Sequence, residues 1–119
     1  MKVIGIDGGA TKVSGCVIEK LDHKTYTLAH PVVDIKYSDH QNFNPEFLPQ
    51  PIDVQHNNED VIAVEKRQGT VYVETVLKVV QLLAENEQFR VAIAMPGLKT
   101  NDGRGIRIMA NGPRIPYFC

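Results

Sequence analysis

A carboxylate, a glycine pair and a hydroxyl stand together near the start of the chain, in the hexapeptide Asp7-Gly8-Gly9-Ala10-Thr11-Lys12. Glycines let backbone N–H groups approach an anion with no Cβ in the way, and such groups can form a concave anion nest. A hydroxyl adds one more phosphate donor. An aspartate beside bound phosphates can hold Mg²⁺, commonly through water, because that ion keeps part of its hydration shell. These residue types therefore indicate a site for a polyphosphate and its metal.

A second interpretation of the hexapeptide stays open. Asp-Gly and Gly-Gly pairs are also favoured in tight hairpin turns for backbone conformation alone, since glycine permits positive φ. The segment is neither a Walker P-loop nor a G-x-G-x-x-G fingerprint, so it gives no support to the mechanisms of those motifs. The residues alone leave a phosphate site and a plain turn as alternatives.

The elements on either side of the hexapeptide read as strands. Lys2–Asp7 and Lys12–Glu19 are short apolar runs rich in β-branched residues, and the brief link between them favours a hairpin. A third strand is expected within residues 24–33. The chain is therefore predicted to open as a three-stranded antiparallel meander.

The later part of the chain combines a helix with two more strands. Residues 70–85 carry an apolar stripe at helical spacing, with Thr70 as the expected N-cap and Gly69 as the break before it. Residues 89–94 are apolar almost throughout, which predicts a central strand covered on both faces, and residues 106–109 form the fifth strand. We therefore expect an α/β fold with a five-stranded mixed sheet and a crossover helix. Residues 37–68 are expected to be a long irregular insertion.

Composition limits the classes of function. The chain has 119 residues, enough for one domain, and its net charge of −1 gives no sign of a nucleic-acid partner or a membrane surface. No apolar run approaches the roughly 18 residues of a membrane span, and the N-terminus lacks the pattern of a signal peptide. Its two cysteines, Cys16 and Cys119, form no disulfide framework. A cytoplasmic location is the expectation.

Two stretches resemble one known family. MKVIGIDGGATKVSGCVIEK is similar to the phosphate-1 region of the actin-like ATPases, and within them to the ROK family of sugar kinases and to bacterial glucokinases. VAIAMPGLKTNDGRGIRIMANGPRIPYF resembles the family's strand, Pro-Gly turn, hairpin and Asn-x-Pro segment. Together they cover somewhat under half of the chain. The resemblance implies a ribonuclease H-like, actin-like ATPase domain that binds ATP and Mg²⁺.

The resemblance also implies residue roles. Asp7 would lie near the metal and the phosphates. The ATP phosphates would be cradled by Gly8, Gly9 and Thr11, with Lys12 beside them. Pro96 and Gly97 would shape the wall of the substrate cleft, and Asn111 would lie near the sugar. Asn111 could equally be a turn residue ahead of Gly112-Pro113.

The family's catalytic base has no counterpart here. That base is an aspartate in an Asn-Asp pair further along the chain, and Asp102, which follows Asn101, is expected to be a structural residue of a hairpin turn. The adenosine-binding half of the family fold is also missing, so we assign no catalytic residue and expect weak nucleotide binding without turnover.

Two alternatives stay open. One is a non-catalytic ribonuclease H-like module that self-associates, forming a homodimer through apolar surface left exposed by truncation. The other is an ATPase domain of the BadF and N-acetylglucosamine kinase type, whose first motif is also Asp-Gly-Gly-x-Thr-Lys. The Pro-Gly and Asn-x-Pro segments favour the ROK family over this second alternative.

Overall fold

Alternating apolar residues in the first strand give the sheet two unlike faces. Ile4 and Ile6 are almost fully buried, whereas Val3 and Asp7 between and beyond them are exposed. Because successive side chains in a strand point to opposite faces, one face of this strand joins the core and the other does not. The computed structural model describes residues 1–118, apart from the side chain of His30.

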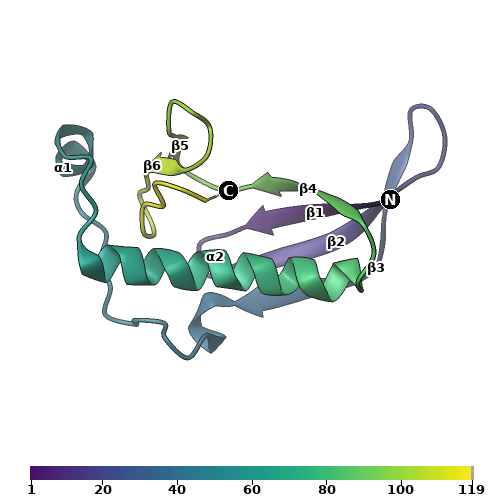
Figure 1. Ribbon diagram of the computed structural model, residues 1–119, viewed down its shortest axis with the longest axis horizontal. Helices are drawn as coiled ribbons and strands as arrows, with labels where there is room; N and C mark the ends of the chain where they lie inside the picture. Colours follow the sequence, from purple (N-terminus) through teal and green to yellow (C-terminus); the bar gives the residue numbers. More distant parts are fainter. Residues whose placement is uncertain (119) are drawn as a thin grey trace.

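The main sheet has four strands in the order β3-β2-β1-β4, and one long helix lies across one of its faces (Figure 1). Its strands are β1 (Lys2–Gly8), β2 (Lys12–Lys20), β3 (Tyr26–Lys36) and β4 (Phe89–Ala94). The first three pair antiparallel, and β4 pairs parallel with β1. The predicted mixed α/β fold, with its meander and crossover helix, is confirmed.

Helix α2 (Ala63–Ala84) provides the other half of the core. Its buried face includes Val71, Val76, Val79 and Leu83, packed on the inward side of the meander. The helix comes very close to β2 at Gly15, where a Cβ would lie 2.5 Å from Val79. Glycine at this position therefore allows the close packing of the helix on the sheet.

The predicted start of this helix was wrong. α2 begins at Ala63, with Gly69 buried inside it, and the Thr70 hydroxyl donates to the carbonyl of Lys66 rather than capping a helix end (3.1 Å). A glycine inside a helix costs only about 1 kcal/mol relative to alanine. Packing of the first turns against the C-terminal segment outweighs that cost, because Gly69 lies against the backbone of Arg114.

The expectation of a central, doubly covered β4 was also wrong. β4 is an edge strand, and only Val91 in it is partly buried. An apolar run shows only that a strand is able to be buried. Whether it is buried depends on its place in the sheet, which the local sequence does not encode.

The remaining elements gather at the end of the sheet where β1 and β4 finish (Figure 1). Strands β5 (Leu98–Lys99) and β6 (Ile106–Ile108) form a separate two-stranded ribbon. The prediction of a single five-stranded sheet is thereby corrected: the strand expected over residues 106–109 pairs with β5, since the turn around Asp102 folds it back on its own segment. That turn is as expected, with Asp102 accepting from the amide of Arg104 (3.0 Å).

The segment 37–68 is more regular than the predicted irregular insertion. It contains the 3₁₀ helix η1 (Tyr37–Asp39), helix α1 (Ile52–Asn57) and the first six residues of α2. Its buried polar residues bond to distant parts of the chain, and hydrophobic periodicity does not detect such contacts.

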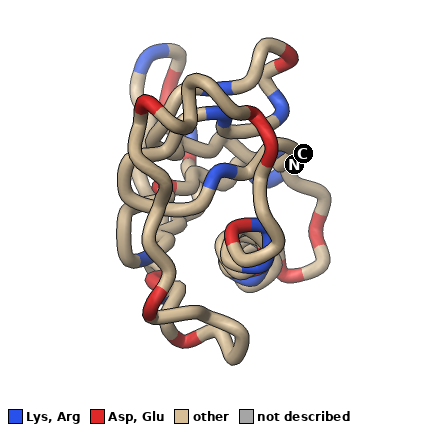
Figure 2. The backbone as a smooth tube through the Cα atoms, turned by 90° about the vertical axis from the view of Figure 1, so that its left-hand side faces the viewer, with Lys and Arg blue, Asp and Glu red and all other residues tan. Residues whose placement is uncertain are grey.

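Basic and acidic positions are interspersed along the backbone (Figure 2). Among the residues that the structure describes, no helix combines the length and apolarity needed to cross a membrane.

Candidate functional site

A cleft of about 450 Å³ opens at the end of the sheet where the parallel strands β1 and β4 finish. In open α/β sheets, the crevice beyond the carboxyl ends of the strands is the usual ligand position. The lining comes from the glycine turn, the Pro-Gly turn, α1, α2 and the segment after β6: Gly8, Gly9, Ala10, Ile52, Tyr72, Pro96, Gly97, Leu98, Ile108, Met109, Ala110, Asn111 and Gly112. The fold thus brings together five of the residues predicted for the site, namely Gly8, Gly9, Pro96, Gly97 and Asn111.

Close contacts rather than backbone conformation favour glycine at positions 8 and 9, since a Cβ on Gly9 would lie 3.2 Å from the Lys12 carbonyl oxygen. Neither Gly8 nor Gly9 is among the described residues with positive φ. A Cβ on Gly8 would lie 1.8 Å from the sulfur of Met95, and the Gly9 amide closes the turn on the carbonyl of Lys12 (2.9 Å). The structure therefore gives no support to the φ-based reason for a plain glycine turn.

Two stacked tyrosines support the turn from below. Tyr37 and Tyr72 have ring centroids 3.6 Å apart and nearly parallel planes. The Tyr37 hydroxyl donates to the carbonyl of Gly9 (3.1 Å), and the Tyr72 hydroxyl donates to that of Ala10 (3.5 Å). The Tyr37 amide donates to the carbonyl of Thr11 (3.1 Å).

These bonds give the turn its polarity. Three successive carbonyls, those of Gly9, Ala10 and Thr11, accept hydrogen bonds from the two tyrosines. The amides of Ala10 and Thr11 meet no acceptor among the described residues, and both residues are exposed. An exposed run of free N–H groups is what an anion nest requires. Sequence reasoning missed both tyrosines, because nothing in their spacing links them to the glycine pair.

The two tyrosine hydroxyls act as hydrogen-bond donors at neutral pH. Burial raises the pKa of Tyr37, and the nearby Tyr72 and the Asp7 carboxylate raise it further. Burial also raises the pKa of Tyr72. Both phenols stay protonated, so each can keep donating to a turn carbonyl.

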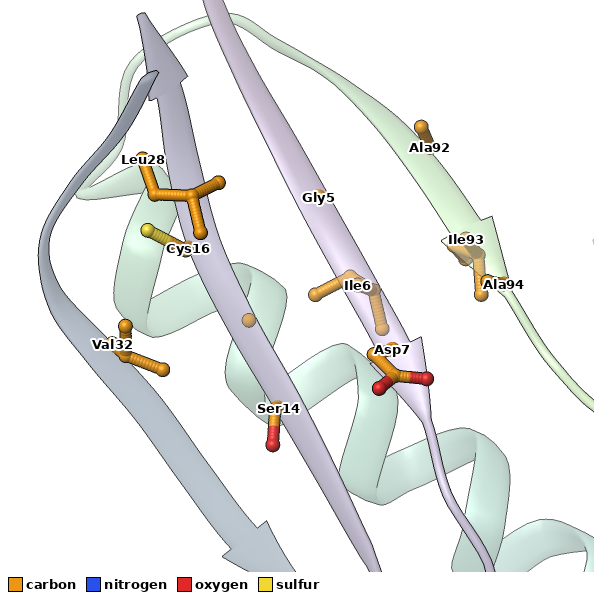
Figure 3. Close-up of a pocket in the computed structure, with 11 residues that line it drawn as sticks. Gly5, Ile6, Asp7, Ser14, Cys16, Leu28, Val32, Ala92, Ile93 and Ala94 are labelled. Atoms are coloured by element: carbon orange, nitrogen blue, oxygen red, sulfur yellow. The ribbon is translucent and has the colours of Figure 1, made fainter. Parts of the chain in front are cut away.

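Asp7 and Lys12 lie beside the cleft rather than in it. Asp7 is exposed on the sheet face away from α2, paired in register with Ser14 and Ala94, and it lines a separate hollow of about 440 Å³ (Figure 3). The Lys12 ammonium lies 3.7 Å from the carboxylate of Asp34, which also accepts from the Ser14 hydroxyl. Thr11 is exposed on the turn and lines neither hollow.

Among the side chains that the structure describes, which do not include that of His30, no three from histidine, cysteine, aspartate or glutamate converge to form a metal site. Asp7 is the carboxylate closest in sequence to the turn, and it forms no hydrogen bond or ion pair with the described residues. One carboxylate fits Mg²⁺ only when phosphate oxygens and water supply the other ligands.

Asn111 lines the same cleft as the glycine turn. It is exposed, and its side-chain amide makes no hydrogen bond with the rest of the described chain, so its donor and acceptor are free. Gly97, which also lines this cleft, has a φ of +95°, and a Cβ there would lie 2.4 Å from the carbonyl oxygen of Ile108. The Pro-Gly turn therefore needs glycine for both conformation and space.

Comparison with protein-family models, with curated proteins and with solved structures finds no match for this chain. The case for a function therefore depends on the geometry of the cleft and its turn.

Proposed function

We propose that this chain is the nucleotide-phosphate-binding domain of an ATP-dependent sugar kinase, with the ribonuclease H-like fold of the actin-like ATPases and closest in type to the ROK family. The observation that carries the proposal is the polarity of the glycine turn. Its carbonyls are bonded to Tyr37 and Tyr72, and its free amides at Ala10 and Thr11 are exposed beside a cleft.

The position of the turn at the end of the sheet supports the same proposal. The turn follows β1, the cleft lies where β1 and β4 end, and an anion bound there would meet the free backbone amides of Ala10 and Thr11. The Thr11 hydroxyl would add one donor. A sugar would lie deeper, against Gly97 and Asn111. The Pro96-Gly97 turn and Asn111, both on the cleft, favour a ROK-like domain over the BadF type.

Asp7 lines the neighbouring hollow and not the cleft, but it lies on β1 directly before the turn. From there its carboxylate would hold Mg²⁺ through water, with the phosphates completing the shell. When bound, this ion would neutralise phosphate charge, which is its main contribution to phosphoryl transfer. We assign no catalytic base to this chain, so the proposed function is binding.

Calorimetric titration with MgATP tests the proposal. The wild-type chain is expected to bind with weak, measurable affinity, and Asp7→Ala to weaken binding about tenfold, which corresponds to about 1.4 kcal/mol. Asp60→Ala is the matched control, because Asp60 is exposed and its carboxylate has no partner among the described residues. Equal affinity in wild type and Asp7→Ala would contradict the metal role of Asp7 and favour the interpretation of the hexapeptide as a plain turn.

A second candidate function is self-association, favoured by the edge strand β4. Phe89 and Ile93 on it are 45% and 40% exposed, and its outer backbone edge has no ladder partner among the described residues. Open apolar edges are templates for pairing with another chain. A homodimer joined at β4 would extend the sheet across two chains.

Sedimentation velocity tests this second candidate. The wild-type chain is expected to dimerise with rising concentration, and Ile93→Lys to stay monomeric. Leu82→Lys, at an exposed leucine of α2, is the control and should dimerise like wild type. A monomer at every concentration would rule out the dimer.

A further inference from the structure

The cleft wall that carries Asn111 has no strand partner of its own. β6 ends at Ile108, and its ladder with β5 ends there too. Met109, the next residue, is 2% exposed, so its backbone N–H and C=O cannot rely on water. A buried backbone group left without a partner is strongly destabilising, so another part of the chain must supply these bonds.

The Gln55 side chain supplies both bonds from helix α1. Its Oε1 accepts from the Met109 amide (2.8 Å), and its Nε2 donates to the Met109 carbonyl (2.8 Å). The second hydrogen of Nε2 goes to the carbonyl of Gln50 (2.7 Å). Gln55 is fully buried. A primary amide has one acceptor and two donors, and here all of them are used.

A second anchor holds the far side of the same wall. The Arg114 guanidinium, 3% exposed, bonds both carboxylate oxygens of Glu65, at 3.1 and 3.0 Å, and the Arg114 amide also donates to that carboxylate (2.8 Å). Asn111 therefore lies on a short span between Met109 and Arg114. Both ends of the span are fixed by side chains from residues 50–65.

We propose that Gln55 is a positioning residue: it replaces a missing strand partner of Met109 and so fixes Asn111 in the lining of the cleft that also contains the glycine turn. The segment containing α1, which has no recognisable motif, thereby gains a role as the support of the substrate wall. That this wall meets a sugar rests on the proposed function. The positioning itself rests only on the contacts of Gln55.

Amide hydrogen exchange followed by NMR tests the positioning without any ligand. In the wild-type chain, the Met109 amide is expected to exchange as slowly as the amides of β1. In Gln55→Leu it should exchange at least tenfold faster, with shifted resonances for Ala110, Asn111 and Gly112 and unchanged protection in β1. Gln81→Leu, at an exposed glutamine of α2, is the control.

Rescue by a conservative variant separates positioning from general packing. In Gln55→Glu, the protonated carboxyl offers one donor and one acceptor and can again bond both Met109 groups, whereas the ionised form repels the Met109 carbonyl. Position 55 is fully buried, and burial raises the pKa of a carboxyl. Met109 protection and the wild-type Asn111 resonance should therefore be present in this variant at pH 5 and be lost at pH 8.5.

The inference is overturned if Met109 exchanges rapidly in the wild-type chain, a result that needs no variant to fold. It is also overturned if Gln55→Leu leaves the wall resonances unchanged. Titration with D-glucose and with MgATP then separates the two claims. In Gln55→Leu, about fivefold more glucose should be needed to shift the Asn111 resonance halfway, whereas the MgATP affinity should be unchanged. Loss of Met109 protection in the variant with no glucose response in either protein would uphold the positioning and contradict the sugar part of the proposed function.

Discussion

Tyr37 and Tyr72 stack face to face, 3.6 Å apart, directly beneath the glycine turn. One comes from η1 and the other from α2, so two elements far apart in the chain meet under the site. Their hydroxyls bond successive carbonyls of the turn, Gly9 and Ala10. The stack thereby engages the turn carbonyls, while the amides of Ala10 and Thr11 have no acceptor among the described residues, and this arrangement is the basis of the proposed phosphate site.

Removing one hydroxyl tests the role of the stack. Tyr37→Phe keeps the ring but leaves the Gly9 carbonyl without its donor, so we expect a loss of about 1 kcal/mol in unfolding free energy. MgATP binding should weaken about threefold to tenfold, because the turn loses a constraint. Tyr72→Phe should have a smaller effect, since its bond is longer (3.5 Å). Urea unfolding and calorimetry measure both quantities.

Tyr26→Phe is the control for these variants, because Tyr26 is 61% exposed on β3. An effect of Tyr26→Phe as large as that of Tyr37→Phe would contradict the supporting role of the stack.

The same tyrosine makes stability depend on pH in the alkaline range. The pKa of Tyr37 is raised by folding, so its stabilising effect is complete below the unfolded-state pKa of about 10. Above that pH the unfolded chain releases a proton that the folded chain keeps, and stability falls by up to about 1.4 kcal/mol per pH unit. Wild type should therefore lose its advantage over Tyr37→Phe between about pH 9.5 and 11 in urea unfolding. A difference that stays constant over this range would contradict the burial of a protonated Tyr37.

Two glycines with positive φ provide a matched pair. Gly97→Ala introduces both backbone strain and a clash with the Ile108 carbonyl, so we expect a loss of about 3 kcal/mol. Gly103→Ala has a φ of +72° and open space around it, so only the strain of about 1 kcal/mol should remain. Thermal and urea unfolding distinguish the two. Equal losses would mean that the Pro-Gly turn moves away from β6.

The buried ion pair between Glu65 and Arg114 should be far more important than the surface pair between Glu59 and Arg107. Glu65→Gln leaves an uncompensated buried guanidinium, at a cost of about 3–5 kcal/mol. Glu59→Gln, at a glutamate 78% exposed, should change stability by less than about 0.5 kcal/mol. Urea unfolding measures both. Similar values would show that the C-terminal segment is not anchored at Arg114.

Hydrophobic periodicity predicted the meander and β4, because the pattern of each strand is contained in a few consecutive residues. It placed the start of α2 seven residues too late, since Gly69 looks like a break when the packing of Arg114 on it is unknown. Residue types singled out Gly8 and Gly9, the family resemblance singled out Gly97 and Asn111, and the fold brings these four residues to one cleft, while their role as a binding site stays a prediction.

The supports of the site could not be predicted. Tyr37, Tyr72 and Gln55 act through side-chain hydrogen bonds across 28 to 62 residues of sequence. Such bonds depend on the completed fold, and no local pattern encodes them.

NMR can observe the free amides of the turn, those of Ala10 and Thr11, directly. In ¹⁵N-labelled wild-type chain titrated with MgATP, the resonances of Ala10 and Thr11 should shift downfield and saturate together, with little change in β3 or the C-terminal half of α2. Ala10 and Thr11 amides that stay in place at saturating MgATP would contradict the phosphate site.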